Sequence, residues 1–295
     1  MSASFSMSEF VAGFWRLTQW QLSLSQRREL VEHYLSLGVS TMDHADIYGR
    51  YECERLFGEV LSQVPSLRSQ MQLVSKCGIK PALAGDARRY VNHYDTSASH
   101  IIQSAEQSLT NLATDYLDLL LIHRPDPLMN ADDIASAFTA LKAAGKVRHF
   151  GVSNFSNSQF ELLQSRLDFP LQTNQIELSP VAMAPLHDGT LDLCQQRNIR
   201  PMAWSCLGGG ALLTAEDERA IRLRAVLETI REQIGADDIS QVVYAWVRMH
   251  PSRPHPIIGS GNPARISSAV ASLKLTLDRQ QWFSIWQAST GHSVP

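Results

Sequence analysis

The sequence lacks the features that would assign it to a membrane, secreted or nucleic-acid-binding class. Its 295 residues contain no run of 18 apolar residues, so no membrane-spanning helix is predicted. The four cysteines, Cys53, Cys77, Cys194 and Cys206, have spacings that indicate neither a disulfide framework nor a zinc site. Lysine and arginine number 26 against 29 for aspartate and glutamate, so no basic surface for nucleic acid is indicated. The first residues, MSASFSMSEF, have no basic segment followed by an apolar one, which favours a cytoplasmic location.

What the sequence does contain is a regular alternation of short apolar runs and amphipathic stretches. Apolar runs typical of buried strands lie at 11–17, 38–45, 71–77, 117–124, 147–154, 173–179, 200–206 and 256–261. Apolar residues recur with helical spacing at 25–38, 97–112, 137–145 and 239–249. Strands that alternate with helices in this way predict an α/β fold, a parallel sheet closed as a (β/α)₈ or TIM barrel.

An open, doubly wound sheet is the alternative fold. It is disfavoured because the first predicted strand is followed by WRLTQW and not by the G-x-G-x-x-G turn of a dinucleotide-binding sheet. No internal repeat or low-complexity linker interrupts the chain, so a single domain over 1–295 is predicted. Two segments do not fit the simple alternation of strands and helices: a long polar connection at 78–96 and an extra helix at 211–235. Long connections of this kind build the mouth of such barrels.

Polar side chains stand at the carboxyl ends of the predicted strands, which converge on one mouth in a barrel. Asp43, Lys76 and His123 end the second, third and fourth strands, and Tyr48 follows Asp43 in the next loop. Later strands end in Ser153, Asn154, Gln175, Trp204, Ser205, Gly259 and Ser260. Each of the first group also has a purely structural interpretation: Lys76 and Asp43 as an ion pair, Tyr48 as a packed aromatic, and His123 as a strand-end cap.

Considered together, Asp43, Tyr48, Lys76 and His123 indicate a chemistry. A phenol with a pKa of about 10 is a weak acid at neutral pH, and a buried ammonium beside its oxygen lowers that pKa. A carboxylate keeps the lysine charged, and a neutral imidazole can polarise a carbonyl oxygen through a hydrogen bond. This set suits the reduction of a carbonyl group, although no side chain supplies the hydride. His44 and Asp46 lie nearby without a third ligand at a known spacing, so no metal site is predicted.

The motifs at these positions resemble those of the aldo-keto reductase superfamily. MDHADIYG, LVSKCG, LLLIHRPD, GKVRHFGVSNF, NQIELSP and AWSCLGGG occur in the expected order, from about Val11 to the C-terminal segment. The sequence looks most similar to the bacterial cytoplasmic oxidoreductases of that superfamily. The resemblance implies a (β/α)₈ barrel that binds NADPH or NADP⁺ without a Rossmann motif. It also implies a monomer that reduces small aldehydes or ketones to alcohols. The charge balance and the lack of a long apolar run predict no nucleic-acid or membrane partner.

The resemblance further implies a role for individual residues. Tyr48 matches the general acid, Lys76 the residue that lowers its pKa, Asp43 the ion-pair partner of the lysine, and His123 the group that orients the carbonyl. Other residues match the cofactor contacts of the superfamily: Ser153, Asn154 and Gln175 at the carboxamide, Trp204 stacked on the nicotinamide, Ser205, Cys206, Leu207, Gly208 and Gly210 near the pyrophosphate, Gly259, Ser260, Gly261 and Arg265 at the adenosine 2′-phosphate, and Trp15 and Arg16 at the cofactor or pocket.

The eighth predicted strand departs from the pattern of the superfamily. Gly259 stands where a lysine is common, and Ser268 and Ala269 replace an acidic residue and an asparagine, so contacts to the adenine are not assigned. Arg265 can still pair with a phosphate, which favours NADPH over NADH.

Two other functions remain open. One is a lyase in which Lys76 forms a Schiff base, disfavoured by Asp43 beside it; the other is a non-catalytic regulator that binds NADPH.

Overall fold

The computed structural model describes residues 5–83, 85, 87 and 89–295. The chain divides into two compact units, Met1–Asn174 and Gln175–Pro295. Within the described residues, the parallel strands follow the order of a closed barrel, β1-β10-β9-β8-β7-β6-β3-β2. This order confirms the predicted (β/α)₈ fold class. The single domain predicted over 1–295 stays a prediction.

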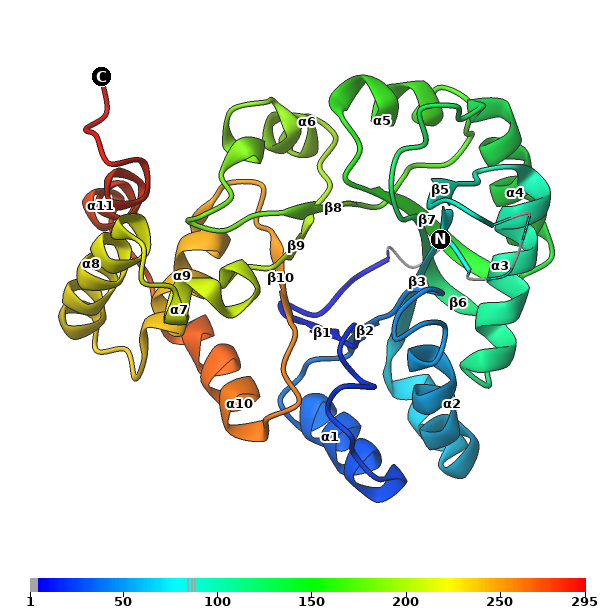
Figure 1. Cartoon of the computed structure of the whole chain (residues 1–295), viewed down its shortest axis with the longest axis horizontal. Coiled ribbons are helices and arrows are strands. Elements are labelled where there is room, and N and C mark those ends of the chain that lie inside the picture. The colour runs from blue at the N-terminus through cyan, green and yellow to red at the C-terminus, as the bar shows by residue number, and fades with distance from the viewer. Residues whose placement is uncertain (1–4, 84, 86, 88) are drawn as a thin grey trace. The chain divides into compact units, whose positions relative to one another are not determined.

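The first unit carries neighbouring parallel strands in the order β1-β2-β3-β6-β7. These strands are β1 (Val11–Gly13), β2 (Thr41–Asp43), β3 (Gln72–Cys77), β6 (Leu117–Ile122) and β7 (Val147–Ser153). The helices of this unit are α1 (Leu24–Ser36), α2 (Cys53–Gln63), the 3₁₀ helix η1 (Pro65–Gln70), α3 (Ala98–Asn111), α4 (Ala131–Ala143) and α5 (Asn157–Gln164). The α-helices lie on the outer side of the strands, as Figure 1 shows.

The polar connection predicted at 78–96 contains a structure that the sequence did not predict. Ile79–Lys80 (β4) and His93–Tyr94 (β5) pair as a short antiparallel hairpin. Lys80 lies within 3.7 Å of the Asp95 carboxylate, close to the start of α3. The hairpin therefore comes directly after the strand that carries Lys76.

The second unit contains the remaining strands and the C-terminal helices. The strands are β8 (Asn174–Glu177), which begins at the unit boundary, β9 (Met202–Trp204) and β10 (His255–Ile258). The helices are η2 (Ala184–Leu186), α6 (Thr190–Gln196), η3 (Gly208–Gly210), α7 (Ala211–Thr214), α8 (Glu218–Ile234), α9 (Ile239–Met249), α10 (Pro263–Ala271), η4 (Ser272–Lys274) and α11 (Arg279–Thr290). Helices α8 and α11 pack side by side (Figure 1). No helix in the described part of the chain is both long and apolar enough to cross a membrane.

The extra helix predicted at 211–235 is two helices, α7 and α8. The break falls at Ala215, which has extended backbone dihedral angles. Asp217 then caps α8, because its side chain accepts a hydrogen bond of 3.0 Å from the Ala220 N–H. An aspartate at this position favours a new helix start over continuation of the first helix.

The strands of the first unit are held together at their amino-terminal ends by a buried ion pair. Arg68 donates to the Asp118 carboxylate over 2.7 Å, and the Leu73 N–H donates to the same oxygen over 2.9 Å. Arg148 approaches the other oxygen at 3.3 Å, and both guanidinium groups lie over the Tyr116 ring. Asp118 is therefore satisfied by partners on three segments, which ties η1, β3 and β7 to β6.

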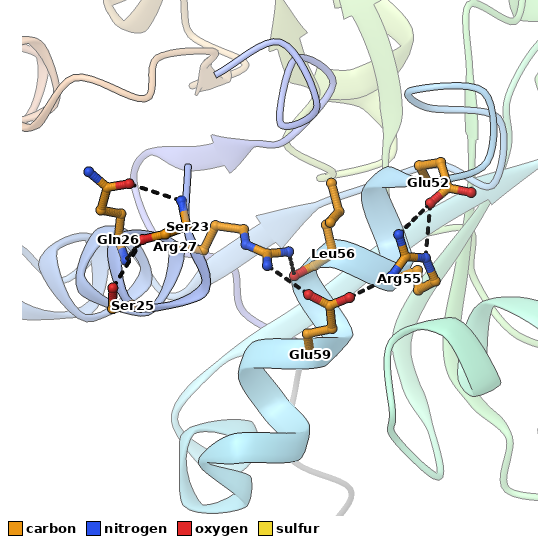
Figure 2. A network of polar contacts seen from close by, with 8 residues as sticks. All are labelled: Ser23, Ser25, Gln26, Arg27, Glu52, Arg55, Leu56 and Glu59. Atoms are coloured by element: carbon orange, nitrogen blue, oxygen red, sulfur yellow. Dashed lines mark hydrogen bonds and ion pairs between the residues drawn. The ribbon is translucent and has the colours of Figure 1, made fainter. Parts of the chain in front are cut away.

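A second polar network joins α1 to α2, as Figure 2 shows. Arg27, nearly buried on α1, donates to the Leu56 carbonyl and to Glu59, both over 2.7 Å. Arg55 then links Glu59 to Glu52 at the start of α2. Since α2 begins five residues after Tyr48, this network fixes the helix that comes after the Tyr48 turn.

Candidate active site

The ammonium of Lys76 is the centre of a buried polar cluster in the first unit. It donates to the Asp43 carboxylate over 2.8 Å, to the Tyr48 hydroxyl over 3.0 Å and to the His44 carbonyl over 2.7 Å. These partners use all three N–H bonds of the ammonium. The side chain of Lys76 is wholly buried and that of Asp43 nearly so.

Register and turn geometry explain why these groups meet. Asp43 pairs with Val74 in the parallel ladder, so Lys76 stands one side-chain layer further along β3 on the same face. Tyr48 lies in the turn after β2, where its N–H donates to the Ala45 carbonyl over 3.1 Å. The next residue, Gly49, has a φ of +58°, and a β-carbon there would lie 2.6 Å from Cys53 Sγ and from Thr18 Cγ2. Only glycine permits the turn that places the phenol over Lys76.

Lys76 keeps its proton although it is buried. Burial lowers the pKa of its amine, but the charge of Asp43 and the Tyr48 hydroxyl outweigh burial and raise the pKa above the ordinary lysine value. The ammonium is therefore a fixed positive charge beside the phenol at neutral pH. An amine held in this state is a poor nucleophile.

The acidity of Tyr48 differs from the sequence-based expectation. Lys76 acts in the expected direction and lowers the pKa of the phenol, but burial raises it more, and the Asp43 charge adds to the rise. The net pKa of Tyr48 lies above the ordinary value of a tyrosine. The expectation of a net lowering was wrong because the motif reveals the nearby cation but not the loss of solvent around the oxygen.

His123 completes the cluster from the end of β6. Its ring meets the Tyr48 ring edge-on, with centroids 5.7 Å apart and an interplanar angle of 77°. Burial, with the charges of Lys76 and Arg124, holds the pKa of His123 well below its ordinary range. The imidazole is therefore neutral at neutral pH and able to donate one hydrogen bond.

A model of the aldo/keto reductase family matches residues 9–289 of the chain. The chain belongs to this family. It is 56% identical over 288 residues to "Oxidoreductase YdhF" of Escherichia coli (strain K12), covering 98% of this chain and 95% of the relative. It is 40% identical over 295 residues to a "6-dehydroglucose reductase" of Agrobacterium fabrum (strain C58 / ATCC 33970), covering 100% of this chain and 98% of the relative. The predicted family is thus confirmed, and the chain is an oxidoreductase.

Solved structures agree on the fold of this aldo/keto reductase. The glycerol dehydrogenase AKR11B4 from Gluconobacter oxydans matches with a TM-score of 0.85 at 20% identity, covering 98% of this chain and 93% of the other. The thermostable aldo-keto reductase Tm1743, solved with the inhibitor epalrestat, matches with a TM-score of 0.79 at 23% identity, covering 97% of both chains. At these identities the likeness supports the fold alone.

The reductase carries four further predicted site residues in its first unit. Ser153 ends β7 and is buried, and Asn154 is the next residue, with a φ of +59°. The Asn154 amide donates to Ser153 Oγ over 2.8 Å and to the His123 carbonyl over 3.4 Å. Trp15 lies after β1 with 55% of its surface exposed, and the Arg16 guanidinium lies 5.1 Å from its ring. The structure therefore joins Ser153 and Asn154 to the backbone of His123, while Trp15 and Arg16 form a separate pair.

The other predicted cofactor residues lie in the second unit, on strands β8 and β9, in the segments that come after β9 and β10, and, for Arg265, in α10. Gln175 is buried in β8, where its amide lies 3.6 Å from Met202 Sδ. The residues that end β9 or come directly after it are Trp204, Ser205, Cys206, Leu207, Gly208 and Gly210. Of these, Ser205, Gly208 and Gly210 have positive φ angles of 53°, 60° and 104°. The residues that come after β10 are Gly259, Ser260, Gly261 and Arg265.

These loops have features that suit an anionic dinucleotide. A β-carbon at Gly208 would lie 2.9 Å from Val181 Cγ2, so only glycine fits this close approach, whereas a β-carbon at Gly210 would meet no atom within 4 Å. Arg265 is exposed in the first turn of α10, and the Asn262 side chain caps that helix. An exposed guanidinium at a helix amino terminus is a favourable environment for a phosphate. The residues present therefore fit the cofactor class predicted from the sequence.

Three participants in the cluster were missed by sequence reasoning. The His44 carbonyl, an acceptor for Lys76, is a backbone group that no motif marks. Arg124 was visible as the neighbour of His123, but its effect on the His123 pKa depends on distance. Glu54 of α2 is buried and accepts a hydrogen bond of 2.6 Å from Ser75, the neighbour of Lys76. A glutamate inside the apolar face of α2 was the available signal.

Proposed function

We propose that the protein is an NADPH-dependent reductase of aldehydes or ketones in which Tyr48 donates the proton to the carbonyl oxygen. The observation that carries the proposal is the 3.0 Å contact between the Lys76 ammonium and the Tyr48 hydroxyl, with Asp43 on the same ammonium. A charged donor that faces the phenol oxygen stabilises the phenolate left after proton transfer.

Each member of the cluster has a distinct task in this proposal. Tyr48 gives its proton to the oxygen of the substrate, and Lys76 stabilises the resulting negative charge. Asp43 and the His44 carbonyl hold the ammonium in place. The neutral His123 imidazole donates a hydrogen bond to the carbonyl oxygen and so polarises the bond that is reduced. The bound nicotinamide supplies the hydride that no side chain can provide.

The cofactor would be held by the residues predicted for it. Ser153, Asn154 and Gln175 offer amide and hydroxyl groups to a carboxamide, and Trp204 offers an aromatic face. The glycine-containing segment 205–210 offers a partly exposed backbone to a pyrophosphate. Ser260 and Arg265 offer a hydroxyl and a guanidinium to a 2′-phosphate, which is the reason to propose NADPH. Trp15 and Arg16 would contact the cofactor or the substrate.

The charge on Lys76 supports a reductase over a Schiff-base lyase. A Schiff base requires a neutral amine, whereas Asp43 holds this amine protonated. Membership of a family of oxidoreductases also disfavours a regulator without catalytic activity.

The relatives suggest a substrate to test first. Two proteins named 6-dehydroglucose reductase are 40% and 35% identical to this chain over nearly its whole length. A sugar with an aldehyde at its terminal carbon therefore belongs in the first panel of carbonyl substrates.

We further propose that the protein acts as a monomer in the cytoplasm, where the four buried free cysteines remain reduced.

The test of the proton-donor role replaces Tyr48 with phenylalanine. Tyr48→Phe should lower kcat for aldehyde reduction by about 10²-fold to 10⁴-fold, the usual contribution of general acid catalysis. NADPH affinity, measured by quenching of tryptophan fluorescence, should stay within about threefold. The matched control is Tyr51→Phe, which removes a hydroxyl three positions away that contacts Arg89 and not Lys76. Wild-type turnover in Tyr48→Phe would refute the proposal.

A further inference from the structure

His44 is the residue directly after Asp43, yet its side chain takes no part in the polar cluster. The imidazole is wholly buried, and neither ring nitrogen has a hydrogen-bond partner among the described residues. An unpaired buried polar group is costly to a folded protein, so its presence calls for an explanation. The backbone of the same residue, in contrast, is part of the cluster: its carbonyl accepts a hydrogen bond of 2.7 Å from Lys76.

The imidazole packs with two phenylalanine rings in a compact group of three. The Phe14 ring stacks on it with centroids 4.8 Å apart and an interplanar angle of 9°. The Phe57 ring meets it at 66° with centroids 4.5 Å apart, and the two phenylalanines touch each other edge to face at 4.9 Å. These rings come from the ends of β1 and β2 and from the middle of α2. We call Phe14, His44 and Phe57 the ring cluster.

The backbone of two residues of the ring cluster is also hydrogen-bonded next to the ammonium. The Phe14 N–H donates to the Asp43 carbonyl over 3.0 Å, and the His44 N–H donates to the Val74 carbonyl over 2.9 Å. The same two residues, Asp43 and His44, supply two of the three acceptors of Lys76. Strand β2 is only three residues long and ends at Asp43, and beyond it the backbone is tied to β3 by the His44 bond and by one from the Asp46 N–H to the Lys76 carbonyl over 3.0 Å. The ring packing acts on the peptide group between these two bonds.

We infer that His44 is a positioning residue for Lys76, and that its imidazole acts as an aromatic plate whose packing fixes the carbonyl that binds the ammonium. The ring needs neither to donate nor to accept a proton for this task. A flat side chain that is stacked on one ring and packed against a second at an angle restricts the direction of its own peptide group. That peptide group then fixes where the ammonium lies relative to the Tyr48 hydroxyl.

The packing around His44 predicts which side chains can replace it. A phenylalanine at position 44 keeps the plate and removes the unpaired nitrogens, so it should preserve the position of the carbonyl. An alanine or a leucine lacks the plate, and the carbonyl gains freedom to turn away from the ammonium. Lys76 then loses one of its three acceptors and is held less tightly against the phenol.

The experiment compares His44→Phe, His44→Ala and His44→Leu with the wild type. It rests on the proposed function for its kinetic readout, namely kcat and KM for an aldehyde with saturating NADPH. The second readout needs no turnover: the ionisation of Tyr48 is followed by ultraviolet difference absorbance against the same variant carrying Tyr48→Phe. His44→Leu, which fills the site without an aromatic ring, keeps the test valid if His44→Ala does not fold.

We expect His44→Ala and His44→Leu to lower kcat by about tenfold, with KM within about threefold, and to raise the Tyr48 midpoint by about one pH unit. His44→Phe should match the wild type in both readouts. The control is Phe138→Ala, which removes a buried ring stacked on Phe150 at 4.2 Å. It should lower thermal stability but leave the Tyr48 midpoint unchanged.

Two results would overturn the inference. One is an unchanged Tyr48 midpoint in a folded His44→Ala or His44→Leu protein. The other is a loss in His44→Phe as large as that in His44→Ala, which would mean that the nitrogens matter and the plate does not. A wild type without carbonyl reduction, combined with the expected midpoint shifts, would instead refute the proposed function and leave the role of His44 standing.

Discussion

Around Lys76, burial and nearby charges shift the pKa values of two groups in opposite directions. Charge prevails at the Lys76 amine, whereas burial prevails at the Tyr48 phenol. The amine has an anion within 2.8 Å, and its pKa rises despite burial. The Tyr48 phenol has the lysine cation within 3.0 Å, yet burial prevails and its pKa also rises. A proton donor for an alkoxide does not need a pKa near neutrality, because alkoxides are about as basic as hydroxide, the conjugate base of water with a pKa of about 15.7. In the proposed mechanism, the task of Lys76 is thus to stabilise the phenolate that forms during transfer.

Cofactor choice should depend on Arg265. Because this guanidinium is exposed at the start of α10, its replacement by alanine should cost little stability. Charge-assisted hydrogen bonds are worth about 1.5–3 kcal/mol, so Arg265→Ala should weaken NADPH binding by about 10-fold to 100-fold and NADH binding by less than about threefold. Fluorescence titration with both cofactors measures the difference. Equal losses for the two would show that Arg265 does not contact the 2′-phosphate.

At the level of strands and helices, the ion pair at the amino-terminal ends of β3 and β6 is expected to support stability. Asp118→Ala leaves the Arg68 guanidinium, whose side chain is 12% exposed, without its anion. Such a loss usually costs about 3–5 kcal/mol. Arg148→Ala removes the partly exposed partner of the same carboxylate and should cost about 1 kcal/mol or less. Urea unfolding of both variants tests the ranking, which fails if the two costs are equal.

Sequence reasoning located the strands well because each is an apolar run that the fold buries. All six residues of β6 are buried, which is the pattern that a parallel sheet covered on both faces produces. Predicted runs were too long where a turn comes after the strand: the run at 11–17 yields a strand only at Val11–Gly13. The hairpin of β4 and β5 was missed because two-residue strands are too short to show a period.

The candidate site was predictable to a similar extent and for similar reasons. Strand-end positions brought Asp43, Tyr48, Lys76 and His123 together as expected, because parallel strands direct their ends to one side. The sequence could not show that Lys76 also binds the His44 carbonyl, since the backbone is the same at every position. It also could not weigh burial against charge at Tyr48, since burial depends on segments distant in sequence.

For the protein as a whole, two buried groups near Lys76 should shape the dependence of stability on pH. Burial, with the Lys76 charge, lowers the pKa of His44 from 6.5 to about 3. The unfolded chain therefore binds a proton that the folded chain does not, and stability is lost as pH falls from 6.5 towards 3. Burial, with the Glu54 charge, raises the pKa of Asp46 from 3.8 to about 8. The folded chain then holds the extra proton, and stability is lost as pH rises from 3.8 towards 8.

The contributions of His44 and Asp46 to the slope of stability against pH have opposite signs in mild acid. Above pH 6.5 only the contribution of Asp46 remains. One unit of pKa shift corresponds to about 1.36 kcal/mol. Asp46→Asn should therefore gain about 2 kcal/mol relative to the wild type between pH 6.5 and pH 8. The asparagine oxygen can still accept the hydrogen bond from the Ile47 N–H. Urea unfolding at the two pH values measures the gain, and a pH-independent difference would contradict the raised pKa.

The order of these groups along the chain has an evolutionary consequence. The acid–base groups end at His123, in the first unit, whereas most candidates for holding the dinucleotide come after residue 174, in the second. Under the proposed roles, most substitutions that change the preference for one coenzyme would therefore fall in a different stretch of the gene from those that would damage proton transfer. The exceptions are Trp15, Arg16, Ser153 and Asn154, which lie in the first unit.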